Sequence, residues 1–300
     1  MQSSEALLLE SFIKTLHHLS EHTRSAYQRD LAYLLEFCDK QEINKWSDLD
    51  GRQVRGFVAS RHRQGIGGRS LQRNLSAIRS FYRYLLDEAK VKNNPAEGII
   101  APKTPRKLPN VLDADQTVQL VEIDDQDALA VRDRAMLELI YSSGLRLAEL
   151  ISINMGDIDF SDRVLTVTGK GKKMRSVPVG KHAIQAIKNW LKIRQSMVNE
   201  NENALFISQR GKRISPRSVQ ERLKQWAIKQ GLPSHVHPHM LRHSFASHML
   251  ESSGDLRAVQ ELLGHADIST TQVYTHLDFQ HLAQVYDKSH PRAHRKKSDS

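Results

Sequence analysis

The first 92 residues carry hydrophobic positions three and four residues apart, the spacing of one face of an α-helix. Two stretches show it clearly, TLHHLSEHTRSAYQRDLAYLLEFC and SLQRNLSAIRSFYRYLLDEA. The apolar positions are Tyr27, Leu31, Leu34 and Leu35 in the first stretch and Leu71, Leu75, Ile78, Tyr82 and Leu85 in the second. Since prolines and glycines are few, residues 1–92 are predicted to form a helical domain.

A cluster of prolines follows this helical pattern. NNPAEGIIAPKTPRKLPN contains Pro95, Pro102, Pro105 and Pro109. Proline lacks a backbone N–H group and stiffens an extended chain. We therefore expect residues 93–110 to connect two domains, a number that suits a chain of 300 residues.

Beyond the connection, the pattern mixes helical and strand periods. LAVRDRAMLELIYSSG predicts a helix that ends near Gly144. RVLTVTGKGKKMRSVPVG alternates apolar and polar residues around a Gly-Lys-Gly turn, which predicts a β-hairpin. Further helices are expected around 181–197, 215–230, 238–252 and 255–263. The predicted fold is therefore mainly α with a small β-sheet (α+β), with a second domain over 111–289 and a basic, flexible tail over 290–300.

Composition narrows the class of protein. Hydrophobic residues make up 39% and charged residues 26%, as in folded globular chains. The single cysteine, Cys38, excludes a disulfide framework and a cysteine zinc site. No apolar run approaches the roughly 20 residues of a membrane span. The acidic N-terminus is a poor signal peptide, so we expect a cytoplasmic protein without membrane insertion.

The net charge of +10 favours a polyanionic partner, nucleic acid first. Between Arg52 and Arg83 the chain has eight arginines and no acidic residue. They are Arg52, Arg55, Arg61, Arg63, Arg69, Arg73, Arg79 and Arg83. Like charges on one surface repel, and the planar guanidinium suits phosphate as a counter-charge. We favour contact with DNA or RNA over the alternative, a solvated basic face.

Two short stretches each place a basic residue close to a glycine, where the chain is predicted to turn sharply. In SSGLRLAEL, Arg146 follows Gly144 at a predicted helix start, where free backbone N–H groups also attract anions. Glu149, three positions on, could hold a basic side chain in place. In TGKGKKMR, Lys170 lies between two glycines and could donate a proton to a leaving oxygen. Lys172 and Lys173 compete for that role, and a solvated lysine or arginine remains the alternative at each position.

Three further stretches complete the set of candidates. In HPHMLRHSFASHML, Pro238 suits a first helical position, so His239 and Arg242 share one face near the helix start. In LLGHAD, His265 follows the glycine at a predicted helix end. In STTQVYTH, Tyr274 falls in the first turn of a predicted helix. The alternative for Tyr274 is packing in a hydrophobic core, the usual role of a tyrosine. The alternative for His265 is helix capping or packing.

Together these residues could transfer a phosphoryl group without a metal ion. Cations would hold the non-bridging oxygens and the charge that develops in the transition state. A phenol has a pKa near ~10 and needs nearby cations to act as a nucleophile.

The succession Gly-Leu-Arg, Gly-Lys-Gly, His-x-x-Arg, Leu-Gly-His and Tyr closely resembles the tyrosine recombinases, also called the phage integrase family, and within it the bacterial Xer recombinases. The resemblance covers essentially the whole chain. It implies an N-terminal SAM-like core-binding domain and a catalytic domain that grip DNA as a C-shaped clamp. The arginine-rich stretch fits the first jaw of that clamp.

The resemblance also implies the role of each residue. Tyr274 attacks the scissile phosphate and forms a 3′-phosphotyrosyl link, as in type IB topoisomerases. Arg146 and Arg242 hold the non-bridging oxygens, and His265 assists them by hydrogen bonding. Lys170 is the general acid on the 5′ oxygen, His239 takes part in proton transfer, and Glu149 supports the site. No cofactor, metal or ATP is implied.

The partners implied are double-stranded DNA with a dif-like site and a XerD-type recombinase, two subunits of each. Such pairs resolve chromosome dimers at cell division, and the FtsK translocase commonly activates them. A C-terminal segment of the family docks on a neighbouring protomer. YDKSHPRAHRKKSDS is the candidate here, with Asp278 to Tyr286 as a possible helix.

Three other interpretations explain part of the pattern. A metal hydrolase could use the histidine cluster, but there is no His-Glu-x-x-His motif and Pro238 interrupts the cluster. The cluster consists of His235, His237, His239 and His243. A DNA-binding protein without catalysis would not need all six catalytic positions filled. An architectural nucleoid protein would explain the charge but not the motifs.

Overall fold

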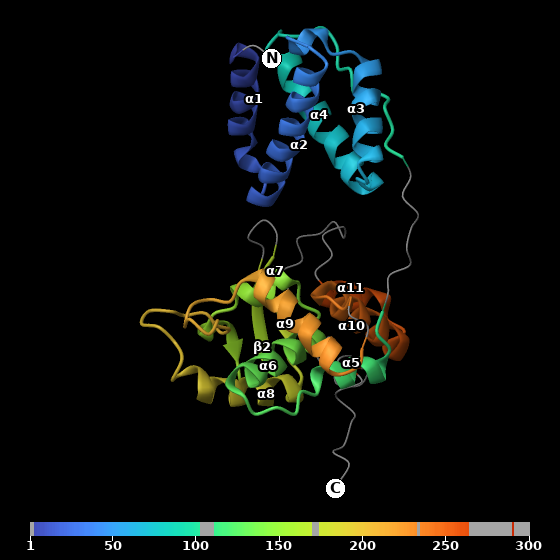
Figure 1. Ribbon diagram of the computed structural model, residues 1–300. Coiled ribbons are helices and arrows are strands. Elements are labelled where there is room, and N and C mark those ends of the chain that lie inside the picture. Colours follow the sequence, from blue (N-terminus) through green and yellow to red (C-terminus); the bar gives the residue numbers. More distant parts are fainter. Residues whose placement is uncertain (1–2, 103–110, 170–173, 233–234, 264–289, 291–300) are drawn as a thin grey trace. The chain divides into compact units, whose positions relative to one another are not determined.

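The computed structural model describes residues 3–102, 111–169, 174–232, 235–263 and 290. Contacts within the chain divide it into two compact units, residues 1–107 and 108–300 (Figure 1). Within the described residues, no helix is long and apolar enough to cross a membrane.

The N-terminal unit is built from helices (Figure 1). They are α1 (Ser3–Thr15), α2 (Glu21–Lys40), α3 (Gly51–Arg63) and α4 (Gly68–Asp87), with short 3₁₀ helices at Leu16–His18 and Trp46–Asp48. The expected helical domain is confirmed. The apolar pattern around Thr15 to Cys38 is not one helix, however. Ser20 interrupts it because its hydroxyl accepts a hydrogen bond from the Thr23 backbone N–H at 3.3 Å and starts α2 there.

The predicted apolar face of α4 forms the centre of this unit. Leu71, Leu75, Ile78, Tyr82 and Leu85 are all buried. On α2, Leu31 and Leu34 are buried, whereas Tyr27 and Leu35 are half-buried at the edge of the core. The two helices therefore meet along the faces that the spacing predicts.

Part of the predicted 93–110 connection packs against α4. Ala96 and Ile99 are buried in the core of the N-terminal unit. Arg79 of α4 donates hydrogen bonds to the carbonyl oxygens of both residues, to Ala96 at 3.1 Å. The prolines of this stretch did not indicate that Ala96 is buried, because its packing depends on the side chain of Arg79, 17 residues earlier in the sequence.

The second unit combines helices with a small sheet, as expected. Its elements are α5 (Ala114–Val121), α6 (Ala128–Ser143), α7 (Leu147–Ser152), a 3₁₀ helix (Met155–Asp157), β1 (Ile158–Asp159), β2 (Val164–Thr168), β3 (Met174–Pro178), α8 (Lys181–Arg194), α9 (Pro216–Lys229), α10 (Pro238–Ser253) and α11 (Leu256–Leu263). The strands form one antiparallel sheet in the order β1-β2-β3. The predicted hairpin is confirmed, with Leu165 opposite Val177 and Val167 opposite Arg175. Strand β1 was not predicted, because its two residues are too few to show the alternation of apolar and polar positions that marks a strand.

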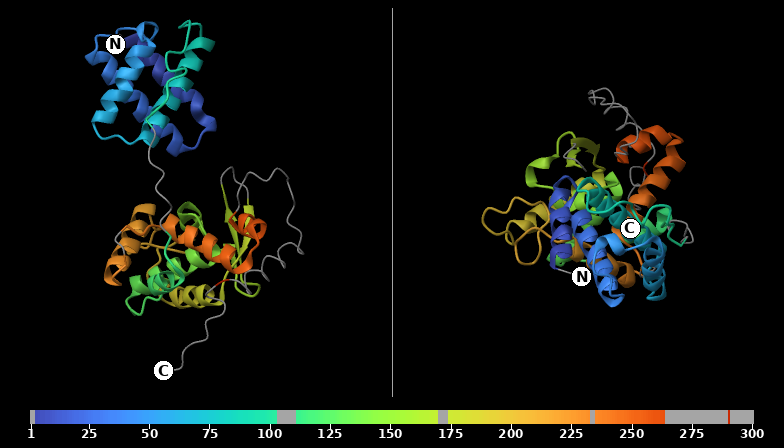
Figure 2. Two further views of the ribbon diagram at one scale, coloured as in Figure 1. Left: turned by 90° about the vertical axis from the view of Figure 1, so that its right-hand side faces the viewer. Right: turned by 90° about the horizontal axis from the view of Figure 1, so that it is seen from above.

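Helix α6 runs through the middle of this unit and packs against α5, α8, α9 and α10 (Figures 1 and 2). Most of its side chains are buried, including the charged Arg132, Asp133 and Glu138. His290 is buried in the same unit, 4.9 Å from the Tyr141 ring and 5.7 Å from the Phe245 ring between centroids. The expected flexible tail therefore cannot start at residue 290, because this imidazole fills a place in the core.

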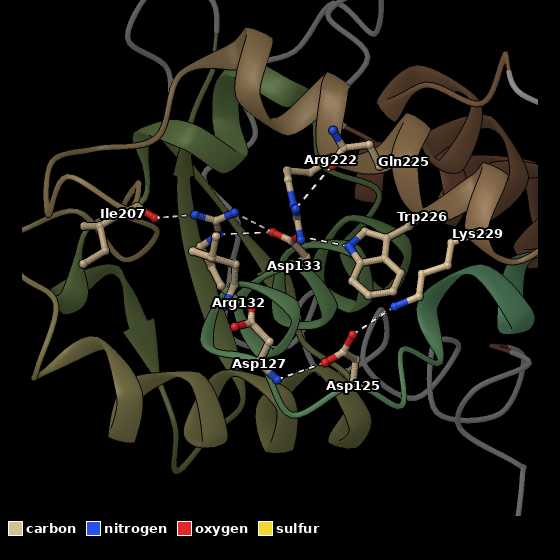
Figure 3. A network of polar contacts seen from close by, with 10 residues as sticks. Asp125, Asp127, Arg132, Asp133, Ile207, Arg222, Gln225, Trp226 and Lys229 are labelled. Carbon is tan, nitrogen blue, oxygen red and sulfur yellow. Dashed lines mark hydrogen bonds and ion pairs between the residues drawn. The ribbon is translucent and has the colours of Figure 1, made fainter.

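A buried aspartate joins α6 to α9 (Figure 3). Asp133 Oδ1 accepts hydrogen bonds from Nε and Nη2 of Arg132 at 3.1 and 2.7 Å. Its Oδ2 accepts from Trp226 Nε1 at 2.9 Å and from Arg222 Nε. Arg132 Nη1 also donates to the Ile207 carbonyl oxygen at 3.0 Å. One carboxylate thus positions α9 and the segment before it.

Asp133→Asn is expected to lower the free energy of unfolding by about 3 kcal/mol, because it leaves the buried Arg132 guanidinium without its counter-charge. Urea unfolding followed by circular dichroism measures this. Asp125→Asn is the control, since Asp125 is far more exposed and pairs with Lys229 at 3.0 Å (Figure 3). The urea concentration at which half of the Asp125→Asn variant is unfolded should hardly differ from that of the unaltered chain. Equal shifts for the two variants would contradict the structural role of Asp133.

Candidate active site

A sharp turn after α6 begins the site. Gly144 ends α6 with a left-handed φ of +58°, and an added Cβ would lie 2.5 Å from Phe245 Cδ1. Glycine is therefore required there on two counts. The turn leads into Arg146, the N-cap residue of α7. The predicted helix start at Arg146 is confirmed.

The carboxylate of Glu149 holds Arg146 at two points. Its Oε2 accepts the Arg146 backbone N–H at 2.8 Å, and its Oε1 accepts Nη1 of the Arg146 side chain at 2.9 Å. The first bond satisfies a helix-terminal N–H group. The second fixes a guanidinium that remains 43% exposed at the surface.

Two more guanidinium groups approach the same carboxylate. Arg175, on β3, donates from Nη1 to Oε1 at 2.8 Å and from Nη2 to Oε2 at 3.1 Å. Arg242, on α10, places Nη1 4.0 Å from Oε2. Glu149 is 3% exposed, so three positive charges surround one buried negative charge.

Burial alone would raise the pKa of Glu149, but hydrogen bonds from Arg175 and from the Arg146 backbone and side chain outweigh it and hold the pKa below its ordinary value. Burial, together with the repelling charge of Arg146, lowers the pKa of Arg242 to about 10. Arg242 remains charged at neutral pH. The excess of positive charge makes this a place for an anion.

Arg242 also ties two helix ends together. Its Nη2 donates to the Leu263 carbonyl oxygen at 2.7 Å, and its Nη1 donates to the Gly144 carbonyl oxygen. These carbonyls end α11 and α6, whose own hydrogen bonds cannot satisfy them. The buried guanidinium is thus fixed beside the turn that carries Arg146.

His239 lies one turn before Arg242 on α10. Pro238 occupies the first helical position, as predicted, and the His237 ring accepts the Met240 backbone N–H at 3.1 Å. The His239 and His243 rings stand edge to face with centroids 4.4 Å apart. Partial burial and the charges of His243, Arg242, His237 and Arg146 lower the pKa of His239. The ring is therefore neutral at pH 7 and can accept a proton.

The structure brings together Arg146, Glu149 and Arg242 and places His239 on the same helix as Arg242. Lys170, His265 and Tyr274 lie outside the described residues, as do Lys172, Lys173 and the expected helix over 278–286. Their assignment stays a prediction.

Arg175 was not predicted from the sequence. A signal was present in the hairpin, because Arg175 shares a strand face with Val177, which is buried. A charged residue on an inward face needs a partner of opposite charge. That signal could have identified Arg175 but not its partner, which lies 26 residues away.

The eight arginines between Arg52 and Arg83 do not share one environment. Arg73 binds the buried Asp30 through Nε at 2.7 Å and Nη2 at 3.0 Å. Arg61 stacks on the Tyr33 ring at 3.9 Å, and Arg79 binds backbone carbonyls. The remaining five are exposed on α3 and α4, namely Arg52, Arg55, Arg63, Arg69 and Arg83. These five are the better candidates for phosphate contact.

The histidine cluster does not have the geometry of a metal site. The rings of His237 and His239 stack at an angle of 21°. Across the parts of the chain that the structure describes, no group of three histidine, cysteine, aspartate or glutamate side chains could hold a metal ion.

The sequence matches the Phage integrase family over residues 110–281 and the SAM-like N-terminal domain of phage integrases over residues 9–89. The chain therefore belongs to the phage integrase family, the tyrosine recombinases, which are site-specific enzymes that transfer DNA strands.

Among its curated relatives are proteins named tyrosine recombinase XerC. The chain is 54% identical to that of Alcanivorax borkumensis over 284 residues, 94% of this chain and 92% of the relative. It is 53% identical to that of Pseudomonas aeruginosa over 293 residues, 96% of each. This confirms the resemblance to Xer recombinases, and to the XerC branch, which ESSGDLR and THLDFQHLA also favour.

Solved structures agree on the fold. The XerH site-specific recombinase, bound to a palindromic difH substrate after cleavage, has a TM-score of 0.72 at 23% identity and covers 93% of this chain and 83% of its own. The Tn1549 transposon integrase in complex with circular intermediate DNA has a TM-score of 0.72 at 17% identity. The match covers 92% of this chain and 98% of the integrase chain.

Glu149→Gln is expected to lower the free energy of unfolding by about 3 kcal/mol at pH 7, since it leaves buried guanidinium groups without a counter-charge. The folded pKa of Glu149 lies below its ordinary value of 4.5, so this contribution is complete above pH 4.5. It is lost as the pH falls through the folded pKa.

Urea unfolding of the unaltered chain and the variant between about pH 7 and about pH 3 measures this difference. Glu221→Gln, at an exposed position of α9, is the control and should behave as the unaltered chain. A difference that stays constant over the whole pH range would contradict the role given to the Glu149 charge.

Proposed function

We propose that the guanidinium cluster around Glu149 binds the scissile phosphate of DNA and that Tyr274 is the nucleophile. The observation that carries this is the charge imbalance, with three arginines on one carboxylate and Arg146 open to solvent. A phosphodiester supplies the missing negative charge and has oxygens that suit planar guanidinium groups.

In the proposed reaction, Arg146 and Arg242 stabilise the non-bridging oxygens, with a hydrogen bond from His265. The Tyr274 oxygen bonds to phosphorus, and its proton passes to His239, whose lowered pKa leaves the ring neutral. The bond from phosphorus to the 5′ oxygen breaks, and Lys170 protonates that oxygen. The 3′-phosphotyrosyl link conserves the phosphodiester energy, so a second 5′-hydroxyl can reverse the step without ATP or a metal ion.

The substrate we propose is a dif-like site, recombined in an assembly of two subunits of this chain and two of a XerD-type recombinase. The identity of 53 and 54% to proteins named XerC supports this assignment. Resolution of chromosome dimers at cell division, coupling to an FtsK translocase and work at the nucleoid belong to the same proposal. Residues 1–92 and 111–289 would each bind DNA, joined through 93–110.

Tyr274→Phe is expected to abolish covalent attachment to DNA and to leave DNA affinity within about 2-fold, since it removes one oxygen from a large charged interface. The protein is mixed with a nicked duplex carrying a dif-like site in EDTA, with and without a XerD-type partner. Denaturing electrophoresis then detects protein bound covalently to DNA.

A covalent band from the unaltered chain, absent from the variant, supports the proposal. Binding without a band under either condition would contradict it and favour a DNA-binding protein without catalysis. Equal loss of binding and cleavage in Tyr274→Phe would mean that the tyrosine is structural.

Replacement of Arg63 and Arg69 by glutamine is expected to weaken the salt dependence of DNA binding. The slope of the logarithm of the binding constant against the logarithm of the salt concentration should become shallower by about 2, because each phosphate that a cation neutralises contributes roughly 0.9 to that slope. Both are exposed, at the end of α3 and the start of α4. Replacement of Lys40 and Lys45 by glutamine removes the same charge from exposed positions elsewhere in the unit. Fluorescence anisotropy at several salt concentrations measures the slopes, and equal changes in both variants would place the DNA-binding surface elsewhere.

A further inference from the structure

Arg175 occupies an unusual place for a charged residue. It is the second residue of β3 and pairs with Val167 across the hairpin. Its side chain is only 9% exposed. A buried guanidinium is costly unless its charge is matched, and here Glu149 supplies the match.

Arg175 and Arg146 share both oxygens of the Glu149 carboxylate. Oε1 accepts from Arg146 at 2.9 Å and from Arg175 at 2.8 Å. Oε2 accepts from the Arg146 backbone at 2.8 Å and from Arg175 at 3.1 Å. The last torsion of a glutamate is broad, so a carboxylate held from one side only could rotate. Arg175 adds a second hydrogen bond to each oxygen from β3, so the carboxylate is held from two sides.

The hairpin is tied to α7 through this contact. In the sequence, Lys170 falls between Thr168, where β2 ends, and Met174, where β3 begins. Arg175 is the second residue of β3. Its bonds to Glu149 therefore connect β3 with α7, whose N-cap residue is Arg146.

We infer that Arg175 is a positioning residue, which acts through Glu149 to orient the Arg146 guanidinium toward the scissile phosphate and to keep the hairpin beside it. The inference rests on the proposed function. It adds a residue that need not touch DNA and that acts only through the carboxylate. Three guanidinium groups face that carboxylate, Arg146 from α7, Arg175 from β3 and Arg242 from α10.

Arg175→Met tests this on the nicked duplex, with the rate of covalent attachment measured at saturating protein. The rate should fall about 100-fold, as expected when a catalytic group loses its alignment, with DNA affinity little changed. Arg222→Met is the matched control, because it takes a guanidinium from another buried carboxylate, Asp133, and its rate should fall much less.

The pH profile separates positioning from general damage to the fold. With one guanidinium fewer, Glu149 takes up a proton at higher pH, so the rate of Arg175→Met should drop more steeply than that of the unaltered chain between about pH 7 and about pH 5. Adding Glu149→Gln to Arg175→Met should remove that extra slope. Arg175→Lys should recover only part of the rate, since an ammonium group cannot bind both oxygens in a planar fork.

Arg175→Met that matches Arg222→Met in rate and pH profile, or Arg175→Lys that cleaves at the full rate, would overturn the inference while leaving the proposed function intact. Failure of the unaltered chain to form any covalent complex would overturn the proposed function, and the role of Arg175 with it.

Discussion

The charged cluster of the second unit depends on one buried carboxylate, Glu149, which is outnumbered by arginines. Glu149 contacts guanidinium groups from α7, β3 and α10, which are distant in sequence. Removing the Glu149 charge would leave three guanidinium groups facing one another without a counter-charge, and two of them, Arg175 and Arg242, are largely buried. The same arrangement that joins the elements therefore leaves a surplus of positive charge at the surface, where Arg146 is open.

Helix α6 brings this cluster and the Asp133 network into one framework. Asp133 lies in the first half of α6 and fixes α9 through Arg222 and Trp226 (Figure 3). Gly144 lies at the other end, where its carbonyl oxygen binds Arg242 and its backbone conformation allows the turn to Arg146. Since most side chains of α6 are buried, both ends are positioned by the same core. A rigid scaffold of this kind can hold charged groups in the alignment that phosphoryl transfer needs.

Local pattern predicted a large part of this fold, because periodicity reports which face of an element is buried. The apolar face of α4, the β2–β3 hairpin and the start of α10 at Pro238 all follow from short-range signals. Partners far apart in sequence could not be predicted in this way. The run of arginines had one sign of charge, but Arg73 pairs with the buried Asp30, which lies 43 residues away, so its charge already has a partner within the chain.

The same limit applied to the site: residues with a local sequence signal were predicted, and a contact between distant segments was not. Residue types at helix starts indicated Arg146, His239 and Arg242, and the roles proposed for them are those that the family resemblance implies. The dependence of Arg146 on Glu149 was anticipated because the two lie within one helical turn. Arg175 was missed because its hydrogen bonds to Glu149 form only after the hairpin has packed against α7.

In the proposed reaction, Arg146 meets the negative charge of the scissile phosphate. The most direct measurement compares covalent attachment of Arg146→Ala to a nicked duplex and to the same duplex with an uncharged methylphosphonate at the scissile position. If the guanidinium stabilises that charge, the variant should lie much closer to the unaltered chain on the methylphosphonate than on the phosphate. An equal deficit on both substrates would contradict the account and give Arg146 a purely structural role.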